Sequence, residues 1–353
     1  MRDHGLEVVL VSPPGGFSGK LQAEGFSWIP LAMNRRSLNP FTEINVIWKL
    51  ATIYRQERPD IVHHFTIKSV AYGSLAARMT GIKAVVNAVA GLGYVYTNES
   101  LKARALRPLV THFLRFVFRG EQSRLIVQNP DDEALFVGKG LIAADKVRLI
   151  LGSGVNTSRF KPDKRSSQNK TACIVFATRL LWDKGIQEYV DAARMLKAAG
   201  VDASFILAGD PDEGNPDTVS LDVLDEWCKE GVVQPLGHVS DMASLLRQAD
   251  IVVSPTAYGE GVPRILIEAA SCGLPLIATD TPGCREIVEH GVSGFLVPPK
   301  NSKELANAMR KLIDDPGKRA VFGKAGRNKV LERFDESIVI NLTFEVYKEL
   351  VDF

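Results

Sequence analysis

The sequence has little of what marks secreted, membrane-spanning or disulfide-stabilised proteins. Its 353 residues include four cysteines, none of which belongs to a C-x-x-C pair. We therefore expect free thiols in a reducing compartment. No apolar run is long enough to cross a bilayer, and residues 1–5 contain no apolar segment typical of a signal peptide. These absences favour a soluble cytoplasmic protein.

An excess of charge of one sign is also lacking. The chain has 43 lysines and arginines against 41 acidic residues, a net charge of +2, which argues against a protein that binds nucleic acid over its whole surface. No cluster of His, Asp and Glu has metal-ligand spacing, and no Asp-x-Asp pair follows a strand, so we expect no bound metal. The length and the 45% hydrophobic content suit two domains of ordinary size.

Strands and helices alternate in two series along the chain. The first series starts with the apolar strand 6–12, and the second starts with 173–177, after a polar linker at 161–170. Alternation of this kind predicts an α/β protein with two doubly wound parallel sheets. Ligands of such sheets bind beyond the carboxyl ends of the strands, and small ligands often lie in clefts between domains.

A glycine-rich turn that leads into a buried helix, residues 258–271, is the strongest candidate site. Glu260 lies in the turn and Glu268 lies inside the helix, whose open N-terminal end attracts an anion such as a diphosphate. A carboxylate among apolar neighbours is costly unless it is hydrogen-bonded, and two sugar hydroxyls would meet that need. The structural alternative is that Glu260 caps the helix and Glu268 pairs with a surface arginine.

Two cations follow the first strand of the second series. Arg179 and Lys184 are five residues apart and precede a helix, so both could face one diphosphate. Their charges would stabilise the negative charge that grows on a departing phosphate, with no metal required. The alternative is a pair of solvated surface charges.

Together these segments resemble glycosyltransferase family 4, the retaining enzymes of the GT-B fold. The resemblance rests on Arg-x4-Lys-Gly at 179–185 and on Gly-Glu-Gly-Val-Pro-Arg-Ile-Leu-Ile-Glu-Ala at 259–269. It implies two Rossmann-like domains facing a cleft, at 1–153 and 154–335, with the final helix 336–353 packing back on the first domain. It implies no cofactor other than a UDP-sugar as co-substrate, and it makes Arg179, Lys184 and Glu260 the candidate catalytic residues. The implied donor contacts are Glu268 at the ribose hydroxyls and, at the sugar, phosphate or base, Gly209, His238, Val239, Gly261 and Val262.

The first half resembles a bacterial branch of that family. The similar segments are His63-x-Phe-Thr-x-Lys68, Gly91-Leu-Gly-Tyr94 and Val-Gln-Asn-Pro-Asp-Asp at 127–132. That branch builds capsule, O-antigen or protein-linked glycans on a polyprenyl diphosphate carrier, which implies such an acceptor and a UDP-N-acetylhexosamine donor. Lys68 and His63 are the candidate acceptor contacts, although His63 and His64 could instead be a strand end bonded to backbone. Many family members have a histidine where this chain has Ala90, so we assign no catalytic base.

The helix at 101–119 combines basic and aromatic residues, a pattern typical of a membrane-surface helix. It predicts a peripheral protein at the inner face of the plasma membrane. The alternative is a core helix with a solvated basic edge.

Two other functions fit parts of the pattern. A GT-B epimerase of UDP-N-acetylglucosamine would need acid–base carboxylates and histidines around the sugar, and the pairing of Arg-x4-Lys-Gly with Glu-x7-Glu argues against it. A non-catalytic scaffold for nucleotide sugars or glycans would bind but not transfer.

The start of the chain resembles an internal point of the family pattern. Residues 2–8 resemble the sequence segment that ends the first helix in this family. The family's first strand, its loop and most of that helix therefore have no counterpart in this sequence. We expect a first domain whose sheet is broken at a central position, and a longer form as the stable and active one.

Overall fold

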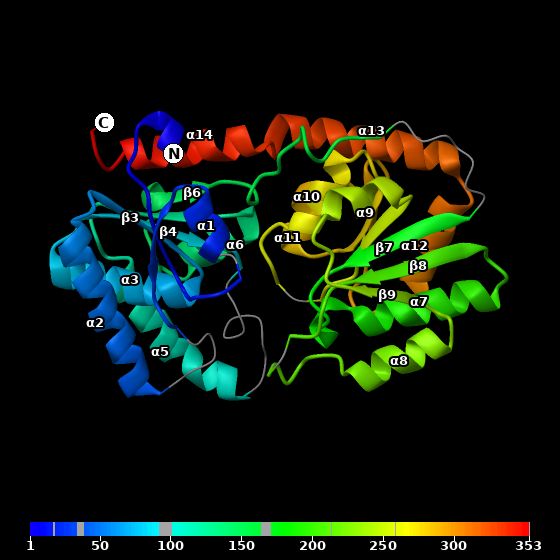
Figure 1. The fold of residues 1–353 in the computed structure, drawn as a ribbon, viewed down its shortest axis with the longest axis horizontal. Helices are drawn as coiled ribbons and strands as arrows, with labels where there is room; N and C mark the ends of the chain where they lie inside the picture. The colour runs from blue at the N-terminus through cyan, green and yellow to red at the C-terminus, as the bar shows by residue number, and fades with distance from the viewer. Residues whose placement is uncertain are drawn as a thin grey trace. The chain divides into compact units, whose positions relative to one another are not determined.

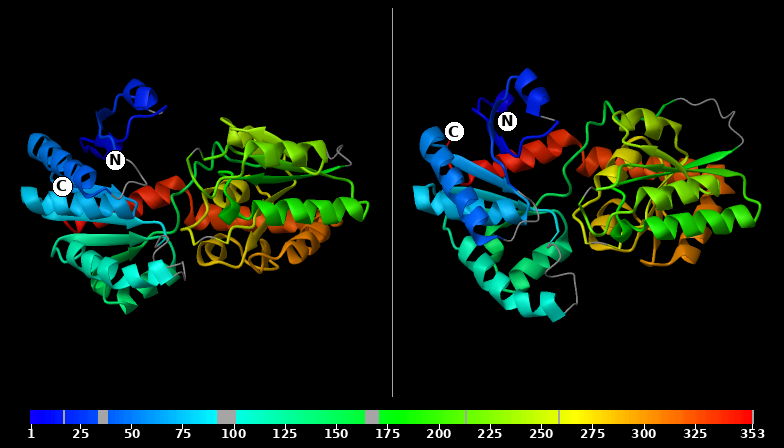
Figure 2. Two further views of the ribbon diagram at one scale, coloured as in Figure 1. Left: turned by 90° about the horizontal axis from the view of Figure 1, so that it is seen from below. Right: turned by 60° about the horizontal axis from the view of Figure 1, so that its bottom comes forward.

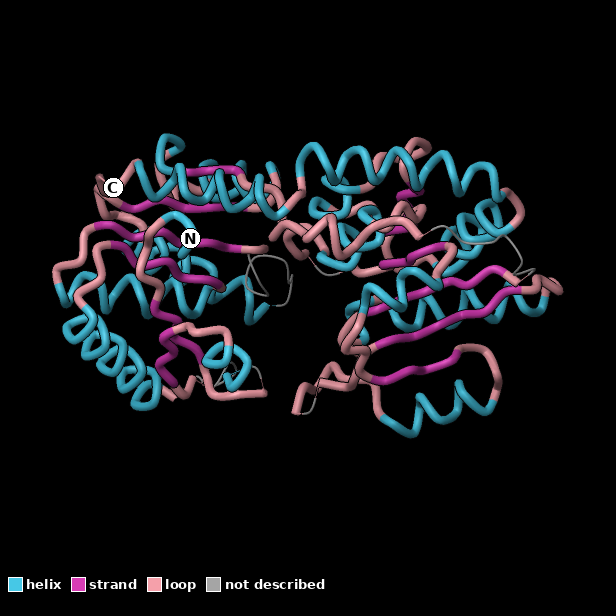
Figure 3. Tube along the Cα trace, turned by 45° about the horizontal axis from the view of Figure 1, so that its top comes forward, coloured by secondary structure: helices cyan, strands magenta, loops and turns pink. Residues whose placement is uncertain are grey.

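The second half of the protein is built on a six-stranded parallel sheet, seen among the described residues (Figures 1 and 3). The computed structural model describes residues 1–16, 18–33, 39–91, 101–163, 171–212, 214–257 and 259–352. The chain divides into two compact units, Met1–Ile150 with Ile340–Phe353, and Leu151–Val339. Sequence analysis predicted a boundary after residue 153. No helix of the described part is both long and apolar enough to cross a membrane.

The strand order of the second unit is β12-β11-β10-β7-β8-β9, and all neighbouring strands are parallel. The order reverses between β7 and β10, so their carboxyl ends form a topological switch point, where doubly wound sheets bind ligands. The strands are β7 (Ala172–Ala177), β8 (Ala203–Ala208), β9 (Gln234–Gly237), β10 (Ile251–Ser254), β11 (Leu276–Thr279) and β12 (Gly294–Val297).

Helices cover both faces of this sheet because successive side chains of the strands point to opposite faces. Ile174 and Phe176 pack with residues of α7 and α12, whereas Val175 and Ala177 pack with residues of α10 and α13. Buried apolar runs on both faces are what a parallel sheet requires. The helical segments are η3 (Trp182–Lys184), α7 (Ile186–Ala198), α8 (Leu221–Lys229), α9 (Met242–Gln248), α10 (Arg264–Ser271), α11 (Pro282–Ile287), α12 (Ser302–Ile313) and α13 (Pro316–Arg333).

The described residues of the first unit form two separate parallel sheets, one of order β3-β4-β5-β6 and a β1–β2 pair. Figure 2 shows the dark-blue segment that carries β1 and β2 beside the four-stranded sheet. The division agrees with the expectation of a broken sheet. The strands are β1 (Val9–Ser12), β2 (Ser27–Pro30), β3 (Ile61–Phe65), β4 (Ala84–Val89), β5 (Ser123–Val127) and β6 (Val147–Leu149). The helices are η1 (Arg2–His4), α1 (Ser18–Ala23), α2 (Pro40–Glu57), α3 (Ile67–Thr80), α5 (Leu101–Val117), α6 (Pro130–Gly138) and η2 (Ala144–Lys146).

The last helix, α14 (Glu336–Lys348), brings the C-terminal segment onto the first unit. The hydroxyl oxygen of Tyr347 lies 2.7 Å from the Nδ1 atom of His63 on β3. Glu349, one residue beyond the helix, accepts hydrogen bonds from Arg124 and Arg148 on β5 and β6. The C-terminal segment is therefore part of the first unit.

Candidate active site

The loops after β7, β8, β9 and β10 form the candidate active site in the second unit. Backbone hydrogen bonds join these loops to one another: the amide of Thr178 donates to Ala208, and that of Leu180 donates to Asp210, both at 2.9 Å. The amide of Gly209 donates to the carbonyl of Gly237 at 2.8 Å. The predicted contacts Gly209 and His238 thus lie on the same rim of the sheet as Arg179.

Glycine is required where these loops approach most closely. Gly185 has a φ of +82°, and a Cβ atom built on it would lie 2.2 Å from the carbonyl oxygen of Pro255, which follows β10. A Cβ atom on Gly209, whose φ is +137°, would lie 1.8 Å from the carbonyl oxygen of Thr178. Only glycine permits both the positive φ and this backbone approach. The Lys-Gly pair at 184–185 is therefore fixed by packing as well as by any ligand.

Lys184 and Glu260, both predicted site residues, form an ion pair across the switch point. Their side chains are 10% and 31% exposed, and Lys184 Nζ lies 2.5 Å from Glu260 Oε1. The hydroxyl of Thr256 lies 3.3 Å from the same carboxylate oxygen. Glu260 therefore does not cap α10, because its carboxylate is bonded to the loop after β7 and to the loop after β10.

Asp183, beside Lys184, is a carboxylate that sequence reasoning missed. Burial raises its pKa, and the charges of Asp217 and Glu260 raise it further, while Lys184 and Arg179 lower it. Its Oδ1 atom is buried and has no hydrogen-bond partner among the described residues. Asp183 thus adds negative charge to a site whose two cations would face a diphosphate.

Arg179 is bonded to a different carboxylate. Its guanidinium lies 2.8 Å from Asp212 Oδ2, and its side chain is 51% exposed. Asn215 also donates to Asp212, at 3.1 Å, so Asp212 is held in its loop after β8. An exposed ion pair is weak and can be exchanged for a stronger anionic partner.

Glu268 is 8% exposed on α10, and its Oε1 atom accepts a hydrogen bond from Arg264 at 2.8 Å. Burial raises the pKa of Glu268, and Arg264 partly offsets that shift. This i,i+4 pair is the arrangement that we gave as the structural alternative. Because Arg264 is 67% exposed, its contact with Glu268 remains open to competition from a ligand.

The turn at 259–263 packs against α11. Gly261 and Val262 are buried, and a Cβ atom on Gly283, at the start of α11, would lie 1.8 Å from the carbonyl oxygen of Gly261. The side chain of His238 is exposed, and Val239 is half-buried. The tract around Gly283 is therefore scaffold that sets the position of the predicted donor loop.

The predicted acceptor contacts lie in the first unit. Lys68, at the start of α3, forms a 2.9 Å ion pair with Glu43 of α2. The ring of His63 is bonded to Tyr347, and burial lowers the pKa of His63 to about 3. His63 is therefore neutral at pH 7, and it is bonded to a tyrosine side chain and not to backbone. The motif residues 92–94 lie outside the described part, whereas Gly91 is within it.

His64 and its partners form a buried polar cluster beneath β3. Its two ring nitrogens lie 2.8 Å from the hydroxyl of Tyr54 and from the amide oxygen of Asn87. Burial lowers the pKa of His64 to about 4. The second histidine of the pair is therefore a structural residue.

The second half of the helix α5 places apolar side chains in the core. Leu114 and Val117 are buried and pack with Phe118, which follows the helix. The guanidinium of Arg115 donates to the carbonyls of Lys139 and Gly140 at 2.7 and 3.0 Å. In its second half α5 thus matches the core-helix alternative.

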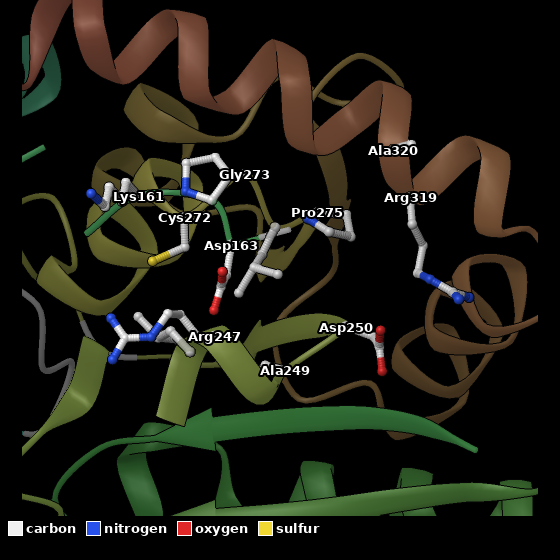
Figure 4. Close-up of a pocket in the computed structure, with 13 residues that line it drawn as sticks. Lys161, Asp163, Arg247, Ala249, Asp250, Cys272, Gly273, Pro275, Arg319 and Ala320 are labelled. Carbon is white, nitrogen blue, oxygen red and sulfur yellow. The ribbon is translucent and has the colours of Figure 1, made fainter. Parts of the chain in front are cut away.

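A hollow of about 220 Å³ lies at the opposite, amino-terminal ends of the strands of the second unit (Figure 4). Its lining includes Asp250, just before β10, and Arg319 of α13. The guanidinium of Arg319 donates to the last carbonyls of α12, and Asp250 accepts from the amide of Cys173 at 2.8 Å. These charges complete the ends of secondary structure elements, so we do not assign a substrate to this hollow.

Two family profiles match the chain. Residues 157–329 match "Glycosyl transferases group 1", and residues 1–129 match "Glycosyl transferase 4-like". The chain belongs to the group 1 glycosyltransferases and has the GT-B fold, so the protein is a glycosyltransferase.

Similar proteins include two enzymes whose names describe transfer to a lipid-linked saccharide. The chain is 28% identical to the N,N'-diacetylbacillosaminyl-diphospho-undecaprenol alpha-1,3-N-acetylgalactosaminyltransferase of Campylobacter jejuni, over 99% of this chain and 93% of that protein. It is 24% identical to the UDP-Gal:alpha-D-GlcNAc-diphosphoundecaprenol alpha-1,3-galactosyltransferase of Escherichia coli, over 90% and 82%.

Solved structures agree in fold. A glycosyltransferase from Rickettsia africae matches with a TM-score of 0.76 and 20% identity, over 99% of this chain and 91% of that one. The HepE protein of Anabaena, solved in complex with UDP, matches with a TM-score of 0.75 and 22% identity, over 97% and 91%.

Proposed function

We propose that this protein transfers a sugar from a UDP-sugar to a lipid-linked saccharide, with retention of configuration at the anomeric carbon. The observation that carries the proposal is the cluster at the switch point: Lys184 forms an ion pair with Glu260 of the loop after β10, and Arg179 lies in the same loop after β7 as Lys184. The relatives that span most of the chain transfer sugars to undecaprenol-diphosphate-linked acceptors, according to their names. An N-acetylhexosamine is the donor sugar that we favour.

The chemistry follows from where charge develops. The bond between the anomeric carbon and the donor phosphate breaks, and a bond to an acceptor hydroxyl oxygen forms on the same face of the sugar. The hydroxyl proton passes to an oxygen of the departing phosphate, so no protein base is needed. Arg179 and Lys184 stabilise the leaving diphosphate, for which they exchange their contacts with Asp212 and Glu260. Glu268 accepts hydrogen bonds from the ribose, in exchange for its bond from Arg264.

We propose that no metal takes part. The described residues contain no group of three or more His, Cys, Asp or Glu side chains that could hold a metal ion. With two cations at the leaving group, activity is expected to survive EDTA. Complete loss that Mg²⁺ or Mn²⁺ restores would contradict this part of the proposal.

We also propose that the protein works at the inner face of the plasma membrane, because a polyprenyl-linked acceptor is held there. Lys68 is the residue that we propose for the acceptor diphosphate. It carries a positive charge at the start of a helix, where free backbone N–H groups also attract anions.

The test is a panel of UDP-sugars offered with a short polyprenyl-diphosphate-linked saccharide, with products read by mass spectrometry. The proposal predicts an acceptor heavier by one sugar, with UDP released. Conversion of UDP-N-acetylglucosamine to its epimer without acceptor would indicate an epimerase. Binding of UDP with neither transfer nor hydrolysis would indicate a scaffold.

A further inference from the structure

The helix α2 has apolar residues on two faces, only one of which is buried. Its inner face places Val46, Leu50 and Tyr54 in a core cluster of the first unit. Its outer face carries Phe41, Ile44 and Trp48, which are 84%, 51% and 55% exposed. Their spacing of three and four residues puts them on one side of the helix. We call Phe41, Ile44 and Trp48 the outer stripe.

We infer that the outer stripe docks on the surface of a lipid bilayer and holds the acceptor side of the enzyme at the membrane. The inference rests on the proposed function, because it assigns the surface that would bring a lipid-linked acceptor to this unit. Exposed apolar side chains gathered on one helix face mark an interaction site more often than scattered ones do.

The chemistry of the stripe favours lipid over protein. Tryptophan and phenylalanine are typical of helices that lie in the headgroup region, where one side of the helix is apolar and the other is wet. Three side chains are also far fewer than the roughly 20–30 residues that each partner contributes to a stable protein interface. A second copy of this chain is therefore a poorer occupant than a bilayer.

Charge along the helix agrees with an anionic lipid surface. The stripe occupies the first three turns. The exposed charged residues that follow it are basic at Lys49, Arg55 and Arg58 and acidic at Glu57 and Asp60. Arg55 continues the same face, seven residues after Trp48. Long basic side chains beside an apolar stripe can reach anionic headgroups while the stripe enters the apolar boundary.

The helix that carries the stripe also contacts the candidate acceptor cation, through a residue on a different side of α2 from the stripe. Ile44 follows Glu43, whose carboxylate lies 2.9 Å from the ammonium of Lys68 at the start of α3. If the stripe is at headgroup depth, Lys68 is near the level at which the diphosphate of a polyprenyl carrier leaves the bilayer. The geometry thus assigns α2 as a lipid-facing element, whereas the sequence left open whether the basic helix α5 faces lipid or the core.

The experiment uses vesicles of phosphatidylethanolamine and phosphatidylglycerol, with intrinsic tryptophan fluorescence as a local readout. Trp48 is exposed, whereas Trp227 is buried and Trp28 is half-buried with its indole N–H bonded to Ser12. We expect vesicles to shift the emission of the protein to the blue. Trp48→Phe should lose the shift while it keeps binding, and the matched variant Trp28→Phe should retain the shift.

Co-sedimentation supplies the second arm. The triple variant Phe41→Ser, Ile44→Ser, Trp48→Ser should bind these vesicles at least fivefold more weakly, and Leu221→Ser should bind normally. Leu221 is the control because it is 67% exposed on α8 of the second unit. Unchanged co-sedimentation of the triple variant, or a blue shift that persists in Trp48→Phe, would overturn the inference. A lipid-free dimer that the triple variant loses would overturn it in favour of a second copy.

Two acceptors separate this inference from the proposed function. The triple variant should transfer sugar to a short, water-soluble acceptor at the wild-type rate, but at least fivefold more slowly to a long-chain acceptor embedded in vesicles. Equal slowing on both acceptors would overturn the docking role. A wild-type protein that binds vesicles through the stripe but transfers to neither acceptor would refute the proposed function and leave the docking surface standing.

Discussion

Lys184 Nζ lies 2.5 Å from Glu260 Oε1, so the cation predicted to hold a leaving phosphate is paired with the carboxylate predicted to lie near the donor sugar. Arg179 has the corresponding relationship with Asp212. Each cation is thus paired with a carboxylate. A diphosphate that replaces those carboxylates would find both cations already in position, which reduces the entropy lost on binding.

Loss of either cation is the first prediction. Arg179→Ala or Lys184→Ala should lower kcat at least tenfold, because a charged hydrogen bond contributes roughly 1.5–3 kcal/mol and here would strengthen in the transition state. The exposed Arg310, on α12, supplies the matched control Arg310→Ala, for which we expect the wild-type rate. Single-turnover transfer at saturating donor is the measurement. Wild-type turnover in both site variants would contradict the assignment of Arg179 and Lys184 to the leaving phosphate.

The Lys184→Ala variant needs a control for the carboxylate of Glu260, which loses its ion-pair partner. Lys184→Ala leaves Glu260 beside Asp183 without its partner, which could disturb the loop in itself. The double variant Lys184→Ala, Glu260→Gln removes that charge. If the double variant regained the wild-type rate, the slower transfer by Lys184→Ala would have come from the unpaired carboxylate of Glu260 and not from a lost phosphate contact.

Substitution of Glu268 should affect folding stability and donor binding in different ways. Burial raises its pKa, so ionisation of Glu268 costs folding stability above its unfolded pKa of about 4.3, and the cost disappears at lower pH. Glu268→Gln should therefore unfold at the same or a higher temperature than wild type at pH 7, yet bind UDP at least tenfold more weakly. Thermal unfolding and calorimetric titration with UDP measure the two effects.

The matched variant for Glu268 is Glu304→Gln on α12, a glutamate that is exposed. It should leave the affinity for UDP unchanged and cost at most a little stability, because Glu304 lies in the first turn of α12. Normal UDP affinity in Glu268→Gln would mean that its bond from Arg264 is a surface pair without a role in the donor site.

The packing of the donor loop gives a third prediction. A Cβ atom on Gly283 would lie 1.8 Å from the carbonyl oxygen of Gly261 and 2.9 Å from that of Glu260. Gly283→Ala must therefore move the turn, at a cost of about 1–3 kcal/mol in stability, and should lower donor affinity. A Cβ atom on Gly138, at the end of α6, would have no atom within 4 Å, so Gly138→Ala should leave UDP affinity unchanged. Equal UDP binding by both variants would show that the turn can shift without effect.

Local patterns in the sequence predicted the two series of strands and helices and the segments of the donor site. The strands and helices are confirmed, and Arg179, Lys184 and Glu260 lie in loops beyond the carboxyl ends of β7 and β10, as the strand ends indicated. The role of these three residues at the donor stays a prediction. The pairing of Arg179 with Asp212 was not predictable in this way. Those residues are far apart in sequence, and they meet because β7 lies next to β8 in the sheet.

Amphipathic helices were the least predictable part. Basic and aromatic residues on α5 are compatible with a core helix or a lipid-facing one, and only tertiary packing shows that Leu114 and Val117 are buried. For α2, sequence periodicity alone could not show that Phe41 and Trp48 lie outside the buried face. Periodicity identifies a face of a helix, whereas the neighbouring elements decide what covers it.

The last prediction concerns the attachment of the C-terminal segment to the first unit. The carboxylate of Glu349 accepts from Arg124 Nε at 2.6 Å and from Arg148 Nε at 2.6 Å, and Arg148 Nη2 also donates to it at 2.5 Å. Hydrogen bonds from Arg148, and then from Arg124, lower the pKa of Glu349. A lowered pKa means that the interaction stabilises the fold above the unfolded pKa of about 4.3 and is lost as pH falls through the folded value.

Glu349→Gln should therefore lower the local stability of residues 340–348 by about 1 kcal/mol at pH 7, since the three side chains are partly exposed. Hydrogen exchange of those amides measures the change, compared between proteins at the same pH so that intrinsic exchange rates cancel. The difference from wild type should narrow as the pH is lowered below 4. Glu345→Gln is the matched control, because Glu345 is 64% exposed and forms an ion pair with Lys348 in the same helix. Protection that is unchanged in Glu349→Gln at pH 7 would show that the helix is held by Tyr347 and apolar packing, without this ion cluster.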